Sequence, residues 1–138
     1  MKFGLVLTEK KLFEVIDAEN LQAAEAQAGL PPHEIDHGIL NEELGIVVGE
    51  FSMFDERKHF FSINKKLFCG NAVIYQFDER GVTQDFEDTD SITSRLAWYN
   101  DQHSVEIAIM AGRIIRPEMT INGQVYWRWP SAKPDWLK

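Results

Sequence analysis

Hydrophobic and polar residues alternate along much of the chain, and this pattern predicts a protein built mainly from short strands. Near the N-terminus, apolar runs at 3–7 and 12–16 flank a short polar turn. Residues 19–28 are rich in Ala, Leu, Gln and Glu, which favour helix. We expect this helix to follow a cap at Asp17 and to end at Gly29.

Three further hairpins are predicted from the spacing of apolar runs and turns. Their arms are 35–40 with 45–54, 71–77 with 82–86, and 113–121 with 124–129. Asn122-Gly123 joins the last pair and is the preferred two-residue hairpin turn. The segment Asp78 to Gly81 joins the middle pair and matches a type I turn followed by a glycine bulge.

Two single strands and one more helix complete the expected pattern. The strands are predicted at 59–63 and 96–99, and a helix at 105–111 follows a cap within 101–104. Together these elements predict an α+β fold, a mostly antiparallel sheet of several hairpins with two short helices packed on it.

Length and composition indicate a single globular domain over residues 1–138, with 44% hydrophobic and 26% charged residues. The net charge of −8 disfavours binding to a nucleic-acid backbone. Cys69 is the only cysteine, which excludes an intrachain disulfide. The first apolar run is too short for a secretory signal, and no apolar run reaches membrane-spanning length. We therefore expect a cytoplasmic protein without membrane association.

One string matches a catalytic motif. His33-Glu34-Ile35-Asp36-His37 fits the pattern in which two histidines one helical turn apart hold zinc and the glutamate acts as general base. In this alternative, His33 and His37 are metal ligands, Glu34 is catalytic and zinc is the cofactor. The chemistry requires a helix, because on a strand the two histidines would lie about 13 Å apart.

The surrounding residues favour an extended backbone over a helix at this motif. Pro31 and Pro32 precede it and Gly38 follows it directly, which leaves room for two turns of helix at most. Residues 33–40 also alternate with a period of two. The sequence therefore predicts no metal site, no cofactor and no catalytic residue in this segment.

Aromatic residues concentrate toward the C-terminus and provide candidates for an interaction surface. Trp127 and Trp129 are two residues apart and would share one face of a strand, and Trp98 lies in another predicted strand. Tryptophan is enriched at protein interfaces, although burial in a small core or on a sheet face is the simpler explanation of these residues.

Three remaining groups contain residues found in metal, anion or catalytic sites, and each has a simpler structural explanation. Asp85 to Asp90 holds four carboxylates, but it lacks the glycine and glutamate of a calcium-binding loop and is expected to be a solvated acidic stretch. Basic residues lie at both ends of the strand predicted at 59–63, where they favour solubility over anion binding. Cys69 follows Leu67-Phe68 and is expected to be buried.

Two functional hypotheses follow from the sequence. The first is a small acidic cytosolic interaction or accessory protein, of the kind found in phages and mobile elements. It would be non-enzymatic and would bind a protein partner or itself, as a homodimer for example. The alternative is a zinc-dependent hydrolase that uses His33, Glu34 and His37.

Overall fold

The computed structural model describes residues 1–32, 35–49, 59–115, 118–121 and 124–127. Its main sheet is antiparallel, with the order β2-β1-β7-β4-β3 and with β8 paired to the end of β7. The strands of this sheet are β1 (Lys2–Leu7), β2 (Leu12–Asp17), β3 (Ile35–Ile39), β4 (Leu44–Gly49), β7 (Ala72–Phe77) and β8 (Thr83–Gln84).

A smaller antiparallel sheet has the order β6-β5-β9, and a separate hairpin pairs β10 with β11. The smaller sheet contains β5 (Phe60–Ile63), β6 (Lys66–Cys69) and β9 (Ala97–Tyr99), and the hairpin contains β10 (Glu118–Ile121) and β11 (Gln124–Trp127). The helices are η1 (Thr8–Lys10, a 3-10 turn), α1 (Leu21–Gln27), α2 (Thr89–Thr93) and α3 (Gln102–Met110). The expected α+β class is therefore confirmed, with three short α-helices where two were predicted.

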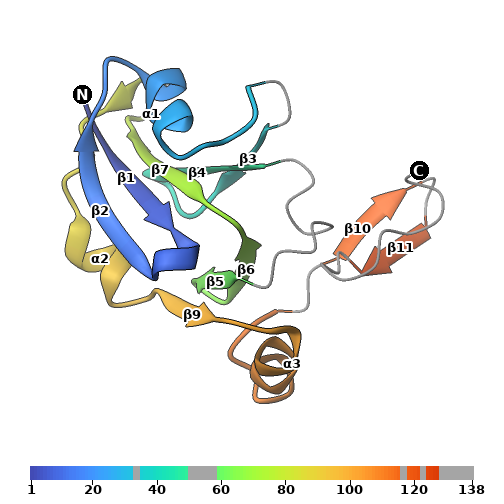
Figure 1. Ribbon diagram of the computed structural model, residues 1–138. Helices are drawn as coiled ribbons and strands as arrows, with labels where there is room; N and C mark the ends of the chain where they lie inside the picture. Colours follow the sequence, from blue (N-terminus) through green and yellow to red (C-terminus); the bar gives the residue numbers. More distant parts are fainter. Residues whose placement is uncertain (33–34, 50–58, 116–117, 122–123, 128–138) are drawn as a thin grey trace.

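The two sheets and two of the helices are stacked as four layers, in the order α1, main sheet, small sheet, α3 (Figure 1). Alternate residues of each strand fill the spaces between layers, because successive side chains point to opposite faces. Phe3 and Leu5 of β1 pack toward α1, while Val6 packs toward the small sheet. On the small sheet, Phe61 packs toward the main sheet and Phe60 packs toward α3.

The side chain of Asn71 joins three segments that are distant in sequence. Its Oδ1 accepts a hydrogen bond from the Thr8 amide at 3.1 Å, and its Nδ2 donates to the Ala28 carbonyl at 3.0 Å. The Thr8 hydroxyl is buried and donates to the carbonyl of Gly70. Asn71 therefore fixes both the β1–β2 turn and the end of α1 to the start of β7.

All three predicted hairpins are present in the described residues, as β3–β4, β7–β8 and β10–β11. The Asp78–Gly81 turn has the expected positive φ of 78° at Gly81, and Ile121 pairs with Gln124 as a two-residue turn requires. Asp101 caps α3 through a 2.7 Å hydrogen bond from the Ser104 amide to its carboxylate. This hydrogen bond holds the pKa of Asp101 below its usual value.

One predicted cap was wrong, and two elements were not foreseen. Asn20, and not Asp17, caps α1 by accepting from the Ala23 amide, since β2 continues through Asp17 to pair with Lys2. The unforeseen elements are β6, which follows a turn at Asn64-Lys65 with φ values of 53° and 67°, and α2. Both positive φ values are typical of a type I′ hairpin turn.

Candidate functional site

The second half of the histidine motif lies on a strand. Ile35 to Ile39 form β3 and pair residue by residue with β4, so the helix that the zinc motif requires is not present over this half. His33 and Glu34 lie outside the described residues, and the assignments of both, with the zinc alternative, stay predictions. Among the described residues, no group of three or more His, Cys, Asp or Glu side chains is placed to hold a metal ion.

His37 belongs instead to a group of three ionisable side chains from three elements. Glu25 of α1 is only 7% exposed, and burial raises the pKa of its carboxyl group, while the charge of nearby His37 lowers it. The His37 ring packs edge-on to Tyr75 of β7, with 6.3 Å between ring centroids. Burial also raises the pKa of the Tyr75 phenol. Burial therefore outweighs the favourable charge of His37, and the ionised form of Glu25 is disfavoured in the folded protein.

We expect Glu25→Gln to stabilise the protein increasingly as pH rises. A pKa raised by folding means that the folded state holds the proton more tightly, so its stabilising effect is lost as pH rises through the folded pKa. Glutamine keeps the shape but cannot ionise. Thermal melts from about pH 4 to about pH 8 measure this effect. A melting-temperature difference that stays constant over this range would contradict it, and Glu79→Gln in the exposed β7–β8 turn is the control.

A second candidate is the outward side of α3, where large apolar side chains are exposed to solvent. Val105 and Ala108 face inward and pack on the small sheet. Ile107 and Met110 point the opposite way, with 45% and 82% of their surfaces exposed. Ile115, just after the helix, is 63% exposed. We call the outward residues Ile107 and Met110 the α3 surface.

The structure describes two of the three tryptophans predicted as interaction residues, Trp98 and Trp127. Trp98 lies on β9 and is partly buried against the core between the sheets, with its ring centroid 6.2 Å from that of Phe61. Trp127 is the last residue of β11 and pairs with Glu118. Trp129 lies outside the described residues. The expectation that these three residues form an interaction surface stays a prediction.

The acidic stretch does not form a single loop. Asp85 accepts a 2.8 Å hydrogen bond from the Lys2 amide, and Asp88 caps α2 by accepting from the Ser91 amide. Asp90 lies in the first turn of α2, where a negative charge interacts favourably with the helix dipole. These carboxylates therefore have local structural roles that the sequence pattern did not indicate.

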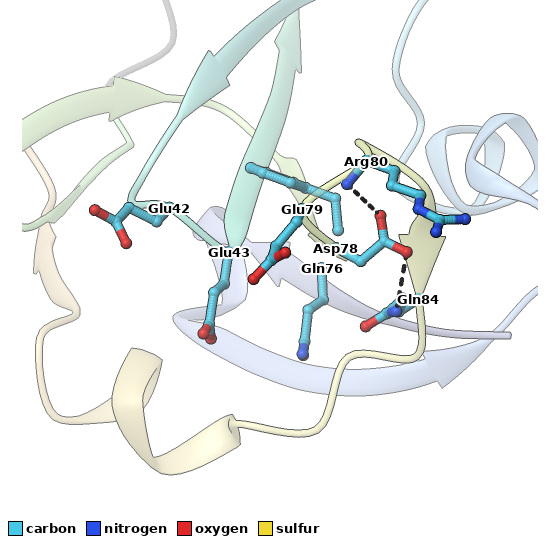
Figure 2. Close-up of a pocket in the computed structure, with 8 residues that line it drawn as sticks. Glu42, Glu43, Gln76, Asp78, Glu79, Arg80 and Gln84 are labelled. Atoms are coloured by element: carbon cyan, nitrogen blue, oxygen red, sulfur yellow. Dashed lines mark hydrogen bonds between the residues drawn. The ribbon is translucent and has the colours of Figure 1, made fainter.

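A different set of acidic residues lines an open pocket of about 500 Å³ beside the β7–β8 turn (Figure 2). Asp78 accepts hydrogen bonds from the Arg80 and Val82 amides and from Gln84, which orders the turn. The side chain of Glu42 points away from the others in Figure 2. The carboxylates of this pocket are therefore spread around an open rim and do not converge on one point.

A smaller pocket of about 440 Å³ lies where α1 ends, lined in part by His59, Thr8 and Glu9. The Nδ1 atom of His59 is buried and has no hydrogen-bond partner in the described part of the chain. Asn71, which also lines the pocket, already bonds through both of its side-chain polar atoms.

Cys69 is fully buried, as expected. Among the basic residues at the two ends of the strand predicted at 59–63, Arg57 and Lys58 lie outside the described residues.

Comparison with known proteins gives no family model, no curated protein sequence and no solved structure that matches the chain. In the described part of the chain, none of the helices has the length and apolar character needed to cross a membrane.

Proposed function

We propose that this protein is a non-enzymatic cytoplasmic interaction protein that binds a protein partner through the α3 surface. The observation that carries the proposal is the exposure of Met110 and Ile107 on one side of a helix whose other side is already packed. Large apolar side chains gathered at a surface mark interaction sites in soluble proteins. Methionine suits such a surface because its unbranched chain adapts to the shape of a partner.

The remainder of the structure is consistent with a binding role. Of the three ionisable residues, Glu25 is almost fully enclosed and Tyr75 packs against the core beneath α1, while His37 lies exposed on the edge strand β3. The carboxylates of the open pocket are spread around its rim and include no metal-binding group among the described residues. The net charge of −8 keeps the protein soluble despite its exposed apolar residues.

Site-specific photo-cross-linking in cells tests this proposal. A photoreactive amino acid at Met110 is expected to give a discrete protein adduct, and Ile107→Glu in the same chain is expected to reduce its yield at least about tenfold. The reason is that a carboxylate placed in an apolar interface loses its water without gaining a partner.

Val82 provides the matched control, because it is 56% exposed on the β7–β8 turn, away from α3. The same photoreactive residue at position 82 is expected to give no such adduct. Equal labelling at positions 110 and 82, or an adduct that survives Ile107→Glu, would contradict the proposal. Mass spectrometry of the adduct identifies the partner, and unchanged melting temperatures show that the variants are folded.

A further inference from the structure

Strand β2 forms an open edge of the main sheet. Met1 and Ala18 exchange two backbone hydrogen bonds, at 3.0 and 2.9 Å, and this sets which residues of β2 bond to β1. In an antiparallel pair, bonded and non-bonded positions alternate. Leu12, Glu14 and Ile16 therefore direct their backbone groups to β1, and Phe13, Val15 and Asp17 direct theirs outward.

The outward backbone groups of Phe13 and Val15 have no hydrogen-bond partner among the described residues. Only the Asp17 carbonyl receives a bond, a long one of 3.4 Å from the Gln27 side chain. The edge strand at the other end of the sheet differs, because the Lys66 ammonium donates to the outward carbonyl of Ile39 on β3 at 2.9 Å. The two edges of the main sheet are therefore not equivalent.

β2 also lacks most of the features that usually prevent an edge strand from pairing. Protein edge strands are commonly protected by proline, by a bulge, by charged side chains (above all lysine) or by a covering segment, and of these β2 carries only two carboxylates, Glu14 and Asp17. β2 contains neither proline nor lysine and pairs with β1 over six consecutive residues without a bulge. Leu12 and Val15 are each 38% exposed, so both faces of the strand are accessible.

We propose that β2 binds a second copy of the chain, antiparallel and about a twofold axis at Val15, so that the two main sheets join into one. This register places Val15 opposite Val15 of the other copy and Phe13 opposite its Asp17, which uses all three outward residues. Each such pair exchanges two backbone hydrogen bonds.

The charges of β2 are compatible with this register and exclude two alternatives. With the axis at Val15, Glu14 lies opposite Ile16 of the other copy and Asp17 lies opposite Phe13, so no two carboxylates face each other. An axis at Glu14 or Asp17 would place identical carboxylates directly opposite, which is destabilising. Each chain still carries a net charge of −8, so the dimer is expected to strengthen as salt screens this repulsion.

Analytical ultracentrifugation of the purified chain with Val15→Pro tests the proposal. Proline removes the outward amide and blocks the edge, yet it leaves the bonds to β1 intact because the Val15 amide points away from β1. We expect a concentration-dependent dimer for the wild type, a dissociation constant raised at least about tenfold by Val15→Pro, and little change for Val15→Thr.

Cysteine substitution checks the register and does not depend on proline being tolerated. In the proposed dimer the two Cα atoms at position 15 are about 5.5 Å apart, within the range of a disulfide. At position 17 they are about 13 Å apart. Val15→Cys is therefore expected to give a disulfide-linked dimer on mild oxidation, and Asp17→Cys is not; native Cys69 is buried.

Three results would overturn the proposal: a wild-type chain that stays monomeric in high salt, a dimer unaffected by Val15→Pro, or equal cross-linking at positions 15 and 17. Met110→Glu is expected to leave this dimer intact. The two proposals can therefore fail separately. A result against the β2 dimer does not contradict partner binding through the α3 surface, and a result against partner binding does not contradict the dimer.

Discussion

Phe61→Ala is expected to lower the free energy of unfolding by about 3–5 kcal/mol, the typical cost of deleting a buried phenylalanine ring. Phe61 is fully buried between the two sheets. Its ring stacks on that of Phe68, with centroids 5.2 Å apart, and also packs against Trp98. Removing it leaves a cavity in the core that the main sheet shares with the small sheet.

Urea unfolding followed by circular dichroism measures this loss. Phe77→Ala is the matched control, because it deletes the same ring at a partly exposed position near the end of β7. A smaller loss is expected there, since less apolar surface returns to water. If Phe61→Ala cost no more than Phe77→Ala, the two sheets would not share a continuous core.

Asn71→Ala is expected to cost about 2–4 kcal/mol. The substitution leaves the Thr8 amide and the Ala28 carbonyl without their partner. A fully buried unsatisfied group costs about 1–3 kcal/mol, and because both of these groups are only partly buried, we expect the lower part of the combined range. The same unfolding measurement applies. Part of the loss is expected to appear as early unfolding of α1, which Asn71 fixes to the sheet.

Two variants separate this role from a general effect of losing an asparagine. Asn41 also accepts two backbone hydrogen bonds, from the amides of Glu43 and Leu44, but it lies in the β3–β4 turn. Water can replace its side chain there, so Asn41→Ala is expected to cost about 1 kcal/mol or less. Asn71→Asp keeps the acceptor for Thr8 and loses the donor to Ala28. Wild-type stability in Asn71→Asp would mean that the link to α1 contributes nothing.

The hairpins could be predicted from the sequence because their turns carry local signals. The Asp78–Gly81 turn requires a residue with positive φ at its end, and Gly81 supplies it. The β5–β6 turn was missed because Lys65 adopts positive φ without being glycine, held there by the pairing of Ile63 with Lys66. Helix α2 was missed because five residues show too little periodicity to recognise.

The candidate surfaces were harder to predict because they depend on packing between distant segments. Residues 105–110 are apolar on nearly every side, so the sequence alone does not tell which side meets the small sheet. The open edge of β2 follows from the order of strands, which places β1 between β2 and β7. From the sequence alone, Glu25 is an ordinary residue of a predicted helix. Only the fold brings His37 and Tyr75 into its neighbourhood.

The position of β7 has a consequence for how the chain is made. β7 lies between β1 and β4, so the N-terminal hairpin and the β3–β4 hairpin have no shared strand until residue 77 has left the ribosome. Until then both hairpins present unpaired edges, a condition that favours aggregation. Slow closure of such long-range pairs is typical of sheets with this topology, so these edges are expected to be the part of the nascent chain that stays unpaired longest.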